Sequence, residues 1–295
     1  MKLTQDISVT SHPSRRRPAA ALSLDFKRQV YRRSGTPVAL GSVLTFARGT
    51  AALQVNASGA LETVAADVLR REHAFSTGEF QGALFEPEAT NLLLYSNDFA
   101  QPYWAGYAAK PSFTGGQPAP DGSLTAMKWN CADTTGGAGG KRGGILKPDT
   151  APAGVATASV WLRASAPVTM RFGHSDGTSK TISVTTQWQR FTYTETLPNN
   201  QNRIFMLYED VNADIDVYIW GAQVEYGSAA TSNIATNGST TTRLADQPGL
   251  TGLTGVFDLT VTYDDDSTDR FDGEGVNEGW WPLMRRIRIK RILLS

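Results

Sequence analysis

Cysteine and histidine are both scarce in this chain of 295 residues. The single cysteine, Cys131, excludes an intrachain disulfide framework and a metal site built from several thiolates. The three histidines, His12, His73 and His174, are too scattered in the sequence to indicate a cluster of ligands. We therefore expect no metal ion and no other cofactor. The alternative is a Ca²⁺ ion held through oxygen ligands by Asp210, Asp214 and Asp216, which we otherwise interpret as solvated acids in turns.

Long apolar runs are also lacking. No window approaches the roughly 18 consecutive apolar residues that a membrane helix requires, so we expect no membrane insertion. The opening stretch MKLTQDISVT lacks the apolar run of about 7 to 15 residues typical of a secretory signal. These features favour a protein that is made in a cytoplasm and stays soluble or leaves by lysis.

Neither sign of charge is in excess, because 28 basic side chains balance 28 acidic ones. A nucleic-acid partner usually shows as a basic excess, so none is expected. The charges are unevenly spread, however. Arg15, Arg16 and Arg17 crowd the start, and an acidic run at residues 264–274 precedes a basic tail. These segments are either solvated surface or complementary contacts between subunits.

What the chain does contain is a series of short alternating apolar runs separated by turns. Charged residues make up only 19%, and 28 glycines and 14 prolines suit many short strands better than helices. The clearest runs are 155–163, 168–172, 180–185, 189–194, 203–208 and 216–225. Their spacing predicts an all-β, antiparallel β-sandwich of the jelly-roll type.

Changes in composition divide the chain into five segments. Residues 1–22 form an extended basic arm that either lies along a neighbouring subunit or is a disordered tail. Residues 23–85 form an N-terminal β region, and 86–228 form the jelly roll. Residues 229–254 are polar, which indicates a linker. Residues 255–295 form a small C-terminal β segment, and its two strands must pack on the sandwich or on a partner.

Several short blocks together resemble the phage tail-fibre and head-spike-fibre proteins, which carry a jelly roll like that of carbohydrate-binding modules. Each block is weak alone, but their order and spacing over residues 24–246 are similar to that family. Two departures are Ala89, where the family often has Arg, and residues 233–236, which replace a Tyr-Ile-Pro-Thr sequence. The blocks are 24–26, 44–48, 82–87, 90–96 with Phe99, 121–126, 188–191, 219–227, 231–232 and 243–246.

The resemblance implies a structural component of a tailed-phage virion, in a tail fibre, tail tip or spike, that binds a host-surface saccharide for adsorption. It also implies other tail or spike proteins as partners and a homo-oligomer, with a trimer favoured. One alternative is a purely architectural baseplate or head-decoration protein. Another is a polysaccharide depolymerase, which would need paired carboxylates across a cleft. No catalytic motif supports an enzyme, and we expect none.

Aromatic residues supply the candidate contacts, since flat rings stack on the C–H faces of sugars. The candidate sugar platform consists of Tyr103, Trp104, Tyr107 and Trp129, for which ordinary packing is the alternative. Trp280 and Trp281 lie between a glycine and a proline and are candidates for a subunit contact, a sugar contact or the core. With Arg15, Arg16 and Arg17 they form the expected assembly interface.

The block at residues 219–227 favours structure over chemistry. Trp188 and Trp220 are expected in the core, and Gly221 indicates a bulge or a close backbone approach. Gln223 and Glu225 would point away from Val224. They are either exposed to water or bonded to an adjacent loop.

Overall fold

The computed structural model describes residues 20–107, 110–134, 143–148, 153–175, 178–198, 203–209 and 213–295. Within these ranges the chain consists of strands and loops, with two short 3-10 turns, η1 (Leu40–Ser42) and η2 (Cys131–Thr134). The same ranges contain no helix of a length and hydropathy suited to crossing a bilayer. The predicted all-β class is confirmed.

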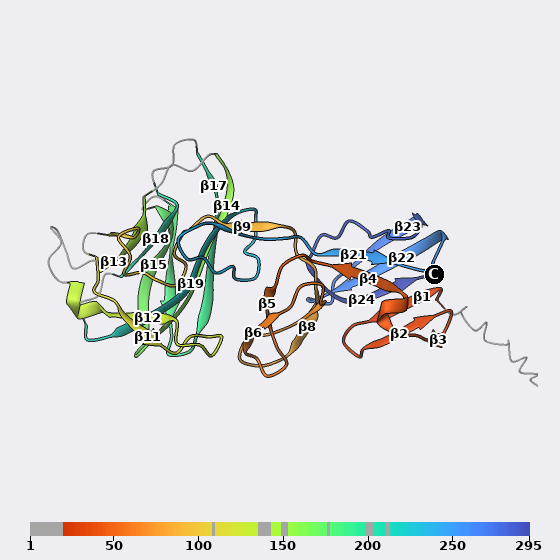
Figure 1. Cartoon of the computed structure of the whole chain (residues 1–295), viewed down its shortest axis with the longest axis horizontal. Coiled ribbons are helices and arrows are strands. Elements are labelled where there is room, and N and C mark those ends of the chain that lie inside the picture. Colours follow the sequence, from red (N-terminus) through yellow and green to blue (C-terminus); the bar gives the residue numbers. More distant parts are fainter. Residues whose placement is uncertain are drawn as a thin grey trace, which may run out of the picture.

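The middle of the chain forms a jelly roll of two five-stranded antiparallel sheets (Figure 1). Its strands are β10 (Ala105–Gly106), β11 (Thr114–Gln117), β12 (Ala126–Asn130), β13 (Gly143–Lys147), β14 (Gly154–Ala164), β15 (Val168–Ser175), β16 (Thr178–Val184), β17 (Gln189–Leu197), β18 (Phe205–Glu209) and β19 (Asp216–Tyr226). One sheet has the order β10-β13-β18-β15-β16 and the other β11-β12-β19-β14-β17.

The alternation along β14 shows how the sequence builds this sandwich. Ala158, Val160 and Leu162 point into the core between the sheets and are fully buried. The intervening positions, Ser159 and Trp161, point to the outer face. Because successive side chains of a strand point to opposite faces, one strand supplies both the core and an outward surface.

A bulge in β19 keeps the apolar side chains of both halves of this strand pointing into the core. Val217 and Ile219 point into the core before the bulge, and Ala222 and Val224 do so after it. The shift occurs at Gly221, whose positive φ of 64° suits a residue without a side chain. The predicted bulge is confirmed.

A second unit, which we call the outer unit, contains the two ends of the described chain (Figure 1). Its strands are β1 (Leu22–Asp25), β2 (Val30–Arg33), β3 (Thr36–Pro37), β4 (Leu44–Ala47), β5 (Ala52–Val55), β6 (Leu61–Val64), β7 (Arg70–His73), β8 (Phe80–Leu84), β21 (Gln247–Leu250), β22 (Gly255–Tyr263), β23 (Thr268–Val276) and β24 (Arg288–Leu294). Strands β9 (Ala89–Asn91) and β20 (Thr241–Arg243) pair where the chain passes between the units.

The pairing of the outer unit differs from the predicted division. Strand β1 pairs with β24, so the segments 23–85 and 255–295 share one sheet and one core. The segment 229–254 is not a simple linker either, because β21 pairs with β4 and Leu250 is buried. The physical reason is that a two-stranded sheet alone is marginal, so the C-terminal strands gain stability from the N-terminal ones.

The β5–β6 hairpin of the outer unit packs on the outer face of the jelly roll. Val55 and Leu61 form a separate apolar cluster with Trp161 and Trp220 of the facing sheet. This face therefore carries the two indoles outside the main core, under the hairpin. The two units meet over a packed surface rather than through a free linker.

We expect Leu162→Ala to lower the free energy of unfolding by about 2–5 kcal/mol, because it leaves a cavity in a fully buried site. Leu124, in the same unit, is 66% exposed, and Leu124→Ala should change stability by less than about 0.5 kcal/mol. Urea unfolding of both variants measures the difference. Equal losses would mean that β14 does not face the core.

Candidate functional site at the junction of the two units

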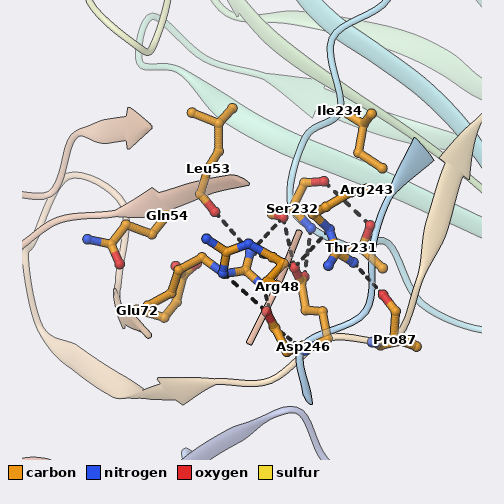
Figure 2. Close-up of polar contacts among 12 residues, drawn as sticks. Arg48, Leu53, Gln54, Glu72, Pro87, Thr231, Ser232, Ile234, Arg243 and Asp246 are labelled. Atoms are coloured by element: carbon orange, nitrogen blue, oxygen red, sulfur yellow. Dashed lines mark hydrogen bonds and ion pairs between the residues drawn. The ribbon is translucent and has the colours of Figure 1, made fainter. Parts of the chain in front are cut away.

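A cluster of buried charges joins the two units, and we call it the clasp (Figure 2). Arg70 stands at its centre and donates to Glu86 at 2.7 Å and to Asp246 at 2.6 Å. Arg48 reaches the other oxygen of Asp246 at 3.1 Å, and Arg243 lies 3.5 Å from Glu86. All five side chains are almost completely buried.

The clasp is hydrogen-bonded to backbone as well as internally. Arg48 donates to the carbonyl oxygens of Thr50 and Ala65 at 2.7 and 2.6 Å. Arg243 donates to the carbonyl oxygen of Pro87 at 2.6 Å. Buried charges are tolerated only where partners replace the lost water, and these bonds supply most of them. The Nε atoms of Arg70 and Arg243 make no hydrogen bond in the described part of the chain.

Glu86 is held ionised by its neighbours. Burial alone would raise the pKa of this carboxyl, but the positive charges of Arg70 and Arg243 and the bonds from Ser232 outweigh it and lower the pKa. Ser232 donates through its backbone N–H at 2.7 Å and its hydroxyl at 2.8 Å. The carboxylate is therefore saturated, which suits a structural role better than proton transfer.

Two side chains of β19 fix the neighbouring loop at residues 231–236. Glu225 accepts the backbone N–H of Thr231 at 2.7 Å and its hydroxyl at 2.8 Å. Gln223 accepts the N–H of Ile234 at 2.7 Å. Of the two alternatives for these residues, the bond to an adjacent loop is the one observed. The loop is thereby held as a rigid wall.

Beside the clasp lies a groove of about 320 Å³, which we call the junction groove. Its walls come from both units: β5, β6, β7 and β8 on one side, β14, β17 and the loop after β19 on the other. The volume is within the usual range for small-molecule sites. The lining residues are Leu53, Gln54, Val55, Leu61, Glu72, His73, Ala74, Phe75, Gln81, Glu86, Trp161, Arg190, Ser232, Asn233 and Arg288.

Three of these lining residues carry a buried polar atom without a protein partner in the described part of the chain. They are Nε1 of Trp161, Nε of Arg190 and Oδ1 of Asn233. Buried polar atoms are nearly always hydrogen-bonded, so each exception needs an explanation. Trp161 also packs against Phe75, with ring centroids 4.7 Å apart. The groove thus combines aromatic rings with two hydrogen-bond donors and one acceptor that have no partner among the described residues.

The ionisable groups of the groove suit binding better than hydrolysis. Glu72 accepts the N–H of Val55 at 3.0 Å, and burial raises its pKa although Arg288 opposes the shift. Glu86 is already saturated by the clasp. Glycoside cleavage needs two available carboxylates, and the groove's described residues offer only Glu72 in that state.

A wider groove of about 690 Å³ lies on the jelly roll near residues 97–98, 115–116 and 235–241. It is lined mainly by small, hydroxyl and amide side chains together with Asp98, Leu124 and Met127, and no aromatic ring is among them. None of its lining residues has a buried polar atom lacking a partner. The junction groove is therefore the stronger candidate site.

The predicted sugar platform does not form one surface. Trp104 and Trp129 are each 1% exposed and belong to the core of the jelly roll. Tyr107 stacks on Tyr208 at 4.1 Å, in a satellite cluster, and Tyr103 packs edge-on against Trp104 at 5.3 Å. Trp104 and Trp129 therefore follow the alternative stated above, which is ordinary packing in the core.

Only two of the five predicted assembly residues lie in the described part of the chain. Trp280 and Trp281 are partly buried and pack on the core of the outer unit, with Trp281 5.0 Å from Phe85. Leu283 nearby is 91% exposed. Arg15, Arg16 and Arg17 lie outside the described residues. The contact of this end with another subunit therefore stays a prediction.

Sequence reasoning missed the residues of the junction groove. Trp161 had a usable signal, because its strand alternates and places it opposite Val160 and Leu162, away from the core. Arg190 lies in β17, the neighbour of β14 in the same sheet, two positions after Trp188. This spacing places the two side chains on the same face of the strand. No sequence signal placed either residue beside the β5–β7 segment.

Comparisons with known proteins concern only part of the chain. No protein-family model matches it, and no curated protein matches it in sequence. A family 16 carbohydrate-binding module is 17% identical, over 45% of this chain and 99% of its own, with a TM-score of 0.31. A mutant of the module CBM29-2, complexed with cellulohexaose, is 11% identical over 48% and 93%, with a TM-score of 0.31. An exo-beta-agarase is 8% identical over 48% and 25%, with a TM-score of 0.35. The jelly roll assigned above rests on this chain's own strand pairing.

We expect Arg70→Met to destabilise the protein by about 3–5 kcal/mol, because it leaves Glu86 and Asp246 short of their central partner. Arg270 is exposed and paired with acids at the surface, so Arg270→Met should cost at most about 1 kcal/mol. Chemical unfolding at pH 7 compares the two. A loss for Arg70→Met no larger than for the control would show that the clasp adds nothing to stability.

Proposed function

We propose that this chain binds a saccharide in the junction groove and serves as a component of a tailed-phage tail or spike. The observation that carries the first part is the meeting of aromatic rings with buried polar atoms that lack partners in one groove. Such pockets join apolar walls to a few placed polar groups that fix orientation. Sugars match this arrangement, since they have apolar C–H faces and many hydroxyls.

The polar lining offers both donors and acceptors for hydroxyl groups. Trp161 Nε1 and Arg190 Nε can donate, and Asn233 Oδ1 can accept. Gln81 adds an amide from β8 and Glu72 a carboxylate from β7. A bound sugar would satisfy groups that the protein leaves unmet, which lowers the cost of their burial.

Two features support the virion role. The ordered sequence blocks over residues 24–246 resemble phage tail-fibre and head-spike-fibre proteins. The outer unit also exposes large apolar side chains, with Leu283 at 91% and Val256 at 73%. Exposed apolar side chains of this size favour contact with another subunit. In this proposal the outer unit joins neighbouring subunits, as a trimer, and the junction groove faces host glycans.

The saccharide proposal predicts binding on a glycan array that depends on Trp161. For the glycan that the array identifies, Trp161→Ala should weaken binding at least about tenfold, because the Nε1 donor and part of the aromatic wall of the groove are lost. Trp161→Phe keeps a ring and should weaken binding less. Trp188→Ala changes an indole near the groove that does not line it, so it is the matched control.

Titration calorimetry measures the affinities, and thermal unfolding checks that each variant is folded. Binding that Trp161→Ala and Trp188→Ala reduce equally would place the ligand elsewhere. An array on which no glycan is retained at high protein density would remove the saccharide function.

The assembly proposal predicts an oligomer in light scattering after gel filtration. Leu283→Asp should shift it to the monomer, because a charge in an apolar contact is costly to desolvate. Leu124, on the jelly roll, is 66% exposed, and Leu124→Asp should leave the oligomer intact. A wild-type chain that is monomeric at every concentration would contradict the assembly role.

A further inference from the structure

The charges around the junction groove do not balance. We count the charged side chains that line the groove, those of the clasp, and Glu225 in the wall behind it. Five arginines face four carboxylates among these described residues, which leaves one positive charge. They are Arg48, Arg70, Arg190, Arg243 and Arg288, and Glu72, Glu86, Glu225 and Asp246.

Arg190 is the one arginine of this set that makes no ion pair with a described carboxylate. Its Nη1 donates to the carbonyl oxygen of Thr231 at 2.7 Å and its Nη2 to the hydroxyl of Ser159 at 2.9 Å. Both acceptors are neutral, and no carboxylate of the described residues lies within ion-pair distance of this guanidinium. The remaining donor, Nε, is buried and has no partner. A guanidinium donor that is buried without a partner is costly.

The other arginines of the set each have an ion-pair partner, and the three of the clasp share two carboxylates. Arg70 and Arg243 share Glu86, and Arg48 and Arg70 share Asp246. Arg288 lies 3.6 Å from Glu72, at the more exposed end of the groove. Burial lowers the pKa of Arg190, and the more distant carboxylates of Glu225 and Glu86 oppose the shift without cancelling it.

We propose that the junction groove takes an acidic saccharide and that a carboxylate of the sugar is the missing counterion of Arg190. This inference rests on the proposed saccharide function and names its ligand class. The Nε–H of Arg190 donates to the sugar carboxylate. Trp161 and Asn233, 5% and 6% exposed, supply a donor and an acceptor for neighbouring hydroxyls. A charge-assisted bond in a partly dry groove is stronger than a neutral one, so it discriminates against uncharged sugars.

The test uses tetramers of galacturonic, glucuronic and mannuronic acid, each beside its carboxyl-reduced counterpart. Reduction replaces the carboxylate by a hydroxymethyl group and leaves the rest of the sugar unchanged. With the full chain in titration calorimetry, at least one acidic tetramer should bind tenfold or more tightly than its reduced form. The preference should weaken as salt is raised.

Variants of Arg190 then locate the effect. Arg190→Gln should bring the affinity for the acidic tetramer down to that of the reduced one. Arg190→Lys, which keeps the charge but lacks Nε–H, should retain part of the preference. Arg270→Gln removes a surface cation from the outer unit and should change nothing. Thermal unfolding of each variant shows that the fold is retained.

The outcomes separate the two proposals. If a reduced tetramer binds as tightly as its acid and Trp161→Ala abolishes both, the groove binds neutral sugar and the inference is wrong, while the saccharide function stands. If Arg190→Gln leaves the preference for acid unchanged, another cation is responsible and the inference is also wrong. If no tetramer binds in either form, the inference fails, and the glycan array decides the saccharide function separately.

Discussion

The structure depends on the ion pairs that Arg70 makes with Glu86 and Asp246. One guanidinium joins two carboxylates that are 160 residues apart in the sequence, at 2.7 and 2.6 Å and out of contact with water. Such a cluster adds little stability over an apolar core of the same shape, but losing one partner is severe. Its effect here is geometric, because it fixes β7, the end of β8 and the segment before β21 in one arrangement. Ser232, in the loop after β19, is hydrogen-bonded to both Arg70 and Glu86 and so ties the jelly roll to this cluster.

The clasp also gives a physical meaning to the sequence blocks that resemble tail-fibre proteins. Arg48, Glu86, Glu225 and Arg243 come from four separate blocks and meet at the clasp or in the wall beside it. The blocks therefore contribute the residues that interact at the junction of the two units. The segment 233–236 lines the grooves instead.

Sequence patterns predicted local structure well and long-range pairing poorly. The alternation of β14 and the bulge at Gly221 depend on neighbouring residues, so periodicity and one glycine sufficed. The pairing of β1 with β24 joins the two ends of the described chain, and no local pattern encodes it. For the same reason the sequence makes Trp129 a candidate for sugar contact, although the structure buries it in the core. The position of Trp161 beside the groove depends on the β5–β6 hairpin, which no local pattern places over its sheet.

The groove exists because the clasp holds its two walls in register. Phe75 belongs to the outer unit and Trp161 to the jelly roll, and their rings meet across the junction. Separate units would have to be brought together by the ligand, which would lower its affinity by the cost of ordering them. The loop with Asn233 is likewise fixed in advance by Gln223 and Glu225. In the proposed function, interactions that never touch the ligand therefore contribute to its affinity, and the junction links the architecture of this protein to recognition.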